Sequence, residues 1–317
     1  MKTKLYIIIL LAITATSYAQ QNAQYNQYIF NELVINPAYA GSKELWNING
    51  IYSSQWTGLS GSPATQTISV DGPVSNKIGL GVHIINDHIG AQSQQGIFGS
   101  YAYRIKLDDK FKLSLGLAVG ASYFTIDGTQ LTMETQDDPA IPKTLQTKLR
   151  FDSKTGLFLY SDRFYAGFSV SDLLSDVFKS GDLMVPTQAR HYYLTSGYVF
   201  DLGEKFKFKP SFLIKEDFKA PTNVDLNAFF LYNERFWLGM SVRTGAKIFN
   251  TKNLDNSLKY EDAVTFMTDF NITDCFRVGY AYTLTLSALK DYPGHEIYLG
   301  YYFPDKQTTK MKNVRYF

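Results

Sequence analysis

The sequence predicts an all-β protein: a single transmembrane antiparallel β-barrel of the outer-membrane type, with about 14 strands. Three observations predict this fold: a two-residue hydrophobic alternation along the chain, a regular exchange of short and long links, and a secretory leader. A water-soluble β-fold also shows the alternation, so the links and the leader decide between the two.

The alternation marks strands with one apolar and one polar or small side. In the segment 111–119, Phe111, Leu113, Leu115, Leu117 and Val119 share one face. The segments that start at Phe236 and Phe276 repeat this pattern. The predicted strands are 46–56, 66–71, 77–86, 95–106, 111–125, 149–160, 164–171, 191–201, 206–217, 223–232, 236–243, 261–270, 275–284 and 295–303.

The links between these strands change length in turn. Residues 107–110 and 233–235 form short links, whereas 126–148, 172–190 and 244–260 form long ones. Outer-membrane barrels have short turns on the periplasmic side and long loops outside. We therefore expect the short turns in the periplasm, and an even strand number brings both barrel ends to that side.

The leader predicts secretion. A basic start at Met1–Lys4 precedes an apolar run, and Ser17 and Ala19 occupy the −3 and −1 positions of a cleavage site. The alternative, a membrane anchor, needs about 20 apolar residues, more than this run has. The predicted organisation is a signal peptide at 1–19, a periplasmic N-terminal segment at 20–45, the barrel at 46–303 and a tail at 304–317. The tail either adds a pairing segment or folds back at the barrel mouth.

Composition agrees with a barrel in outer-membrane lipid. The formal net charge is +2, from 31 basic and 29 acidic residues, which argues against nucleic acid as a partner. Aromatic residues make up 15% of the chain, enough for girdles at the membrane interfaces. Cys275 is the only cysteine, so no intrachain disulfide is possible.

Signals for catalysis are weak. Asp87-His88 offers half a metal site, but an aspartate beside a solvated histidine in a turn is the commoner arrangement. The chain has no Gly-x-Ser-x-Gly, His-Glu-x-x-His or phosphate-loop motif. We therefore predict no enzyme activity, no catalytic residue, no metal and no cofactor.

The N-terminal segment differs from the strands. It is rich in Gln and Asn up to Gln27, and Asn36-Pro37 disfavours helix at Asn36. We expect it to pack against the barrel mouth or to plug the barrel, with direct partner binding as the alternative. Inward positions such as Gly79, Gly167 and Gly279 are small, which favours a plugged or narrow interior.

The chain resembles the PorP/SprF family of type IX secretion system membrane proteins over essentially its whole mature length. The run 36–41, Asn-Pro-Ala-Tyr-Ala-Gly, followed by Gln-Trp-Thr-Gly at 55–58 is the most specific part of the resemblance. The family-typical candidates for shape or partner binding are Gln27, Tyr28, Asn36, Pro37, Tyr39, Gly41, Gln55, Trp56, Gly58, Pro63, Asp87 and Gly90.

This resemblance implies a non-enzymatic outer-membrane barrel that serves export or surface attachment of a large secreted protein, such as an adhesin of gliding bacteria. The partner would be the C-terminal type IX signal domain of that protein, and other secretion components are further candidates. Addition of a strand to an exposed loop strand is a reasonable binding mode. The alternative function is a porin-like channel for small molecules, which needs an open, charged constriction.

Overall fold

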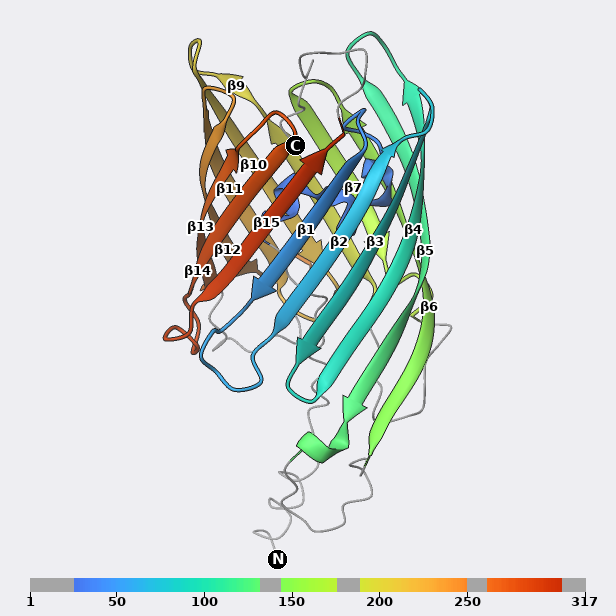
Figure 1. Cartoon of the computed structure of the whole chain (residues 1–317), viewed down its shortest axis with the longest axis vertical. Helices are drawn as coiled ribbons and strands as arrows, with labels where there is room; N and C mark the ends of the chain where they lie inside the picture. The colour runs from blue at the N-terminus through green and yellow to red at the C-terminus, as the bar shows by residue number, and fades with distance from the viewer. Residues whose placement is uncertain (1–25, 132–143, 176–188, 250–260, 304–317) are drawn as a thin grey trace, which may run out of the picture.

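Antiparallel strands form one closed sheet in the computed structural model (Figure 1). The structure describes residues 26–131, 144–175, 189–249 and 261–303, so the predicted signal peptide and tail lie outside the described residues. The strands are β1 (Asn47–Ser54), β2 (Ala64–Pro73), β3 (Ile78–Ile89), β4 (Gln92–Lys106), β5 (Lys112–Asp127), β6 (Leu145–Tyr160), β7 (Phe164–Ser171), β8 (His191–Tyr198), β9 (Phe200–Asp201), β10 (Phe206–Glu216), β11 (Thr222–Tyr232), β12 (Phe236–Ala246), β13 (Glu261–Asn271), β14 (Phe276–Thr285) and β15 (Gly294–Tyr302).

The barrel closes between its first and last strands. β1 pairs with β2 on one side and with β15 on the other, for example Asn47 with Asp71 and with Tyr302. Because β10 pairs with β11 as well as with β8 and β9, no gap remains in the ring. β8 and β9 are two parts of one strand, so the described residues form the 14 strands that the sequence predicts.

Pro210 explains the division between β8 and β9. The register continues unchanged from Ser211–Gly197 to Phe208–Phe200, so no residue is inserted and there is no bulge. Proline has no N–H to donate, and the ladder is interrupted opposite it, at Tyr198 and Val199. The strand therefore has an interrupted ladder opposite Pro210 and no bulge.

Several strands reach further toward the long loops than predicted. β3 ends at Ile89 rather than at residue 86, β4 begins at Gln92 rather than at 95, and β6 begins at Leu145 rather than at 149. Asn86 pairs with Gln95 in this extension, so the ladder continues after the outward side chains have become polar. Hydrophobic alternation does not detect such a continuation, because backbone hydrogen bonds alone maintain it.

The outer face of the barrel is apolar, and aromatic pairs lie near the short turns. Adjacent rings pack around this end at Tyr198–Phe200, Phe206–Tyr232, Phe236–Phe270 and Tyr301–Phe303, with centroid distances of 4.6, 4.9, 6.5 and 5.0 Å. These eight side chains are exposed. Such a girdle marks the interface between lipid tails and headgroups in outer-membrane barrels.

Residues 26–43 run inside the barrel (Figure 1). Three short 3-10 helices follow one another there: η1 (Gln27–Phe30), η2 (Glu32–Val34) and η3 (Pro37–Tyr39). The segment ends at the short-turn end of the barrel, where β1 begins. A fourth 3-10 helix, η4 (Gly128–Gln130), follows β5. Of the two structural arrangements that we expected for this segment, the structure shows the plug, and we call residues 26–43 the plug below.

Candidate functional site

Small residues on the inner wall let the plug approach the strands closely. A Cβ atom on Gly116 of β5 would overlap the backbone of Ala38, and one on Gly79 of β3 would overlap the carbonyl of Ala40. A Cβ on Gly156 of β6 would overlap the side chain of Asn36. Glycine at these inward positions therefore matches the path of the plug.

The Asn-Pro-Ala-Tyr-Ala-Gly run forms the second half of the plug. The Asn36 side chain caps η3, accepting the N–H of Ala38 at 3.0 Å, while its amide donates to the carbonyl of Leu157 at 3.0 Å. Pro37 is the first residue of η3, where a missing N–H costs nothing. Tyr39 is fully buried and meets the Phe158 ring edge-on at 5.4 Å.

Gly41 fixes the exit of the plug toward β1. Its φ of 70° lies in the left-handed region that favours glycine. Its N–H donates to Asp71 Oδ2 at 2.8 Å, and its carbonyl accepts a hydrogen bond from Arg104 Nη1 at 2.6 Å. Both side chains belong to the wall and are buried, so they replace the water that this turn would otherwise bind.

The first half of the plug is held by Glu296 of β15. The two oxygens of its carboxylate accept the backbone N–H groups of Asn26, at 3.0 Å, and Gln27, at 2.6 Å. The Gln27 side chain donates to the Glu296 carbonyl at 3.3 Å. The hydroxyl of Tyr28 accepts a hydrogen bond from the Asn227 amide of β11 at 2.9 Å.

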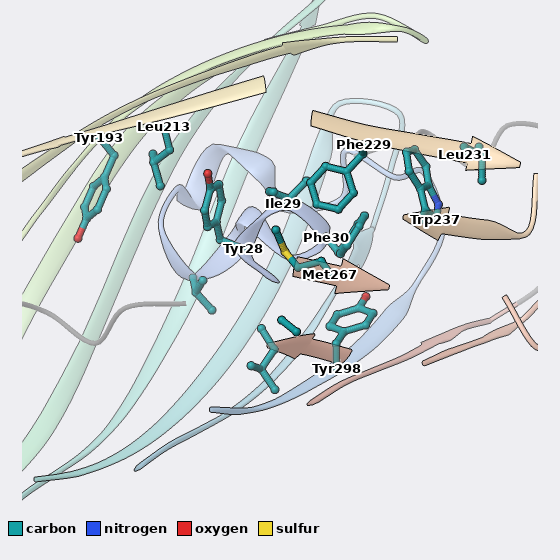
Figure 2. Close-up of a cluster of buried hydrophobic side chains, with 13 residues drawn as sticks. Tyr28, Ile29, Phe30, Tyr193, Leu213, Phe229, Leu231, Trp237, Met267 and Tyr298 are labelled. Carbon is teal, nitrogen blue, oxygen red and sulfur yellow. The ribbon is translucent and has the colours of Figure 1, made fainter. Parts of the chain in front are cut away.

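An aromatic cluster surrounds Phe30. Figure 2 shows this ring beside Phe229, Trp237 and Tyr298 of the wall, with centroid distances of 5.6, 6.0 and 6.0 Å. The guanidinium of Arg277, which is bonded to Asp269, lies 3.9 Å from the Phe30 ring centroid. Both apolar burial and a cation–π contact therefore hold the plug at this point.

Charged groups lie between the plug and the wall. Lys43 donates to the carbonyl of Phe30 at 3.0 Å, and Lys154 donates to that of Val34 at 3.1 Å. Burial raises the pKa of the Glu32 carboxyl to about 8, and the positive charges of Lys209 and Lys43 counteract that rise. The polar groups of the lumen thus serve the plug rather than an open water column.

A small cavity remains beside the plug on the long-loop side. It holds about 70 Å³, and Val34 and Ile35 of the plug form part of its lining together with Arg150, Asp152 and Lys154 of β6. Sites for small molecules measure roughly 300–1,000 Å³. This cavity is therefore smaller than a substrate site of that kind.

The remaining predicted residues lie at the long-loop end, away from the plug. Gln55 N–H donates to the Pro63 carbonyl at 2.9 Å within the β1–β2 loop, where Trp56 has a φ of 51° and Gly58 one of 99°. Gly90 N–H donates to the carbonyl of Gly61 at 2.9 Å, which ties the β3–β4 turn to this loop. Asp87 accepts the Thr65 hydroxyl at 2.5 Å.

The structure therefore divides the predicted site residues into two groups. Gln27, Tyr28, Asn36, Pro37, Tyr39 and Gly41 belong to the plug, and Gln55, Trp56, Gly58, Pro63, Asp87 and Gly90 belong to the long-loop rim. Sequence reasoning missed the wall residues Asp71, Arg104 and Glu296. Their signal was a charged residue at an inward position of an alternating strand, and a charge that becomes buried there needs a hydrogen-bonding or charged partner.

The described residues contain no group of three or more His, Cys, Asp or Glu side chains that could hold a metal ion. His83 stacks on Phe98 at 5.0 Å, and its Nε2 lies 3.4 Å from Lys154 Nζ. In the described part of the chain, no helix is both long and apolar enough to cross a membrane.

A closed barrel of 14 strands with an apolar outer face and an aromatic girdle defines an outer-membrane β-barrel protein. Comparison with known protein families identifies the family within this class. The chain belongs to the PorP/SprF family: the family model described as "Type IX secretion system membrane protein PorP/SprF" matches residues 17–301. The predicted family and outer-membrane location are thus confirmed.

Solved barrels with little sequence identity are also similar to this chain. Omp33 of Acinetobacter baumannii is 12% identical, with 83% of this chain and 100% of Omp33 covered and a TM-score of 0.45. A FadL homologue of Pseudomonas aeruginosa is 10% identical, with 91% and 96% covered and a TM-score of 0.44. The CymD monoaromatic hydrocarbon channel is 11% identical, with 90% and 95% covered and a TM-score of 0.47. No curated protein sequence matches the chain.

Proposed function

We propose that this protein is a plugged, non-enzymatic barrel that binds a large secreted or surface protein through the C-terminal signal domain of that protein. Binding supports export of the partner or its attachment at the cell surface. The observation that carries this proposal is the filled lumen, because a barrel whose interior is occupied by its own chain is suited to binding rather than to solute passage.

The contacts of the plug argue against the porin alternative. Plug residues bond to strands on opposite sides of the barrel: Asn26 and Gln27 to β15, Tyr28 to β11, and Asn36 to β6. Ile29, Ala38, Tyr39 and Ala40 have no exposed surface. A porin needs a water-filled constriction lined by charged side chains.

The long-loop end is the side that we assign to the partner. Following the rule for outer-membrane barrels, we place the short turns in the periplasm and the long loops outside the cell. At that outer end, the entrance to the barrel is surrounded by the long strands β5 and β6 and by the rim group, which consists of Gln55, Trp56, Gly58, Pro63, Asp87 and Gly90. Other type IX secretion components would meet the barrel as further partners.

An affinity purification of tagged protein from outer membranes in mild detergent tests the proposal. We expect one very large secreted protein with a C-terminal type IX signal domain to co-purify in stoichiometric amount, and the purified signal domain alone to bind. A barrel that purifies alone and does not bind signal domains would overturn the proposal. Conductance in planar bilayers then tests the porin alternative, for which the plugged lumen predicts no stable open channel.

A further inference from the structure

A collar of four wall residues, one from each of the strands β12 to β15, holds Asn26 at the start of the plug. The Asn26 side-chain oxygen accepts hydrogen bonds from Arg243 Nη2 at 3.0 Å and from the Thr265 hydroxyl at 3.4 Å. Its side-chain amide donates to the Thr283 hydroxyl at 3.2 Å, and its backbone N–H donates to the Glu296 carboxylate at 3.0 Å. Four adjacent strands therefore fix the position of this one residue in the lumen.

The collar lies at the long-loop end of the barrel. Glu296 is the third residue of β15, which begins at Gly294 directly after the β14–β15 loop. Thr283 of β14 pairs with Gly294. Arg243 lies three residues before Ala246, where β12 ends at its long loop. The plug therefore begins among the last few residues of these strands before the long loops.

The other end of the plug is bound at the short turns. Gly41 donates its N–H to Asp71 and accepts a hydrogen bond from Arg104 at its carbonyl. Asp71 pairs with Asn47, the first residue of β1, and Arg104 lies two residues before the end of β4 at Lys106. A plug that folded into the barrel from the periplasm would have both ends at the short turns. This plug instead crosses the lumen in one direction, from the long loops to the short turns.

The chain that precedes Asn26 has too little length to return to the short turns. Along β15, Glu296 lies six residues before Tyr302 at the short-turn end, which is about 20 Å at about 3.3 Å per residue. The predicted cleavage after Ala19 leaves only residues 20–25 before the plug, and six residues reach at most about 20 Å when fully extended. These residues would have to run fully extended through a lumen that the plug already fills.

We propose that the amino-terminal end of the mature chain lies outside the cell, and that the plug is a strap that crosses the barrel from the outer mouth to the periplasmic end. The assignment of the long loops to the outside follows the rule for outer-membrane barrels. The expectation of a periplasmic segment at 20–45 then applies only to its end near Gly41. This inference goes beyond the proposed function, because it holds for the barrel without its partner.

The strap places the amino terminus on the side that we assign to the partner. Residues 20–25 carry no charged side chain, so they would add amide groups, one tyrosine and the terminal amine to the surface around the rim group. One covalent segment thereby joins this outer surface, through Asn26 and its collar, to the periplasmic end at Gly41.

A maleimide attached to a polymer too large to cross the outer membrane tests the side on which the terminus lies. All variants carry Cys275→Ser, because Cys275 is the only native cysteine. Ala23→Cys reports on the terminus. Ser60→Cys, in the β1–β2 loop, and Glu204→Cys, in the turn before β10, report on the two ends of the barrel, and both positions are exposed.

We expect the full-length Ala23→Cys protein to show the one-polymer gel shift in intact cells, to the same extent as Ser60→Cys. Glu204→Cys should react only after the outer membrane has been permeabilised. The compact, fast-migrating form on unheated gels shows that each variant has folded. No signal domain is needed for this readout, so its result does not depend on the proposed function.

Three results would overturn the inference. Ala23→Cys that reacts only after permeabilisation, together with Glu204→Cys, would place the terminus in the periplasm. Ala23→Cys that reacts only after denaturation would place it inside the barrel. Intact cells in which Glu204→Cys reacts and Ser60→Cys does not would show that the long loops face the periplasm.

Discussion

Glu296 holds the first residues of the plug: its carboxylate accepts the backbone N–H of Gln27 at 2.6 Å and that of Asn26 at 3.0 Å. Asn26 precedes Glu296 by 270 positions in the chain and Gln27 precedes it by 269, yet these side chains and backbone groups meet in the same lumen. One side chain of the last strand thus connects the closure of the barrel to the position of the plug.

Replacement of this carboxylate tests the anchor. We expect Glu296→Ala to reduce the free energy of unfolding by about 3–6 kcal/mol, since each of two charge-assisted hydrogen bonds contributes about 1.5–3 kcal/mol. The measurement is the urea midpoint of the protein folded in lipid vesicles. Asp291→Ala, in the exposed β14–β15 loop, is the control and should change little. Equal midpoints for both variants would show that Glu296 does not anchor the plug.

Crowding at Gly116 gives a second test of the plug. Gly116→Val places a side chain where Ala38 now lies, so we expect destabilisation of about 1–3 kcal/mol, the usual cost of overpacking. We also expect bilayer conductance events that wild-type protein lacks, because the plug must shift. Thermal loss of the fast-migrating band on unheated gels and single-channel recording measure the two effects.

The matched control for that substitution is Gly99→Val in the neighbouring strand. Gly99 is exposed on the outer face, and nothing lies within 4 Å of a Cβ built there. The Gly99→Val substitution should therefore leave both the stability and the conductance of the protein close to those of the wild type. If Gly99→Val and Gly116→Val behave alike, the effect comes from valine in a strand and not from contact with the plug.

Strand number was predictable from the sequence because side-chain alternation is a local property. The face that carries Leu115 and Leu117 repeats every second residue, whatever the rest of the chain does. Strand ends were less predictable, since at Asn86–Gln95 the ladder continues with polar side chains on the outside.

The plug shows what local reasoning cannot supply. Its composition indicated a segment unlike a strand, but Asn36 meets Leu157 from 121 positions away, and no local pattern specifies that contact. The small inward residues Gly79 and Gly167 were visible in the sequence, and they indicated a plugged or narrow interior. Two motif residues, Asn36 and Gly41, lie against inward glycines of the wall, which accounts for their positions but not for the rim group that contains Trp56.

Phe30 should be the most sensitive apolar residue of the plug. It is 2% exposed and packs against three aromatic side chains of the wall. We expect Phe30→Ala to cost about 3–5 kcal/mol, as truncation of a buried phenylalanine usually does. The urea midpoint in vesicles measures this change.

Phe206→Ala is the control for that truncation. Phe206 is 48% exposed in the girdle, where it packs on Tyr232, so the same loss of atoms removes much less burial. A similar cost for both variants would mean that the cluster around Phe30 does not contribute more than a surface aromatic pair.

The β11–β12 turn offers a stabilising substitution far from the plug. Asn233 and Glu234 are the two central residues of the turn that the hydrogen bond from the Arg235 N–H to the Tyr232 carbonyl closes, and both have positive φ, 51° and 56°. Asn-Gly is the favoured pair for such a turn, and the left-handed conformation costs an ordinary residue about 1–2 kcal/mol. We therefore expect Glu234→Gly to raise the free energy of unfolding by about 1 kcal/mol, seen as a higher urea midpoint.

The ion pair of Glu234 opposes this gain only slightly. Lys207 Nζ lies 3.2 Å from its carboxylate, but the Glu234 side chain is 58% exposed, and surface pairs contribute about 0–1 kcal/mol. Lys207 also keeps its contact with Asp201 at 2.9 Å after the substitution. Glu234→Ala is the control: it removes the same ion pair without relieving the backbone, so it should be neutral or destabilising. A midpoint for Glu234→Gly no higher than that of Glu234→Ala would refute the assignment of strain to this turn.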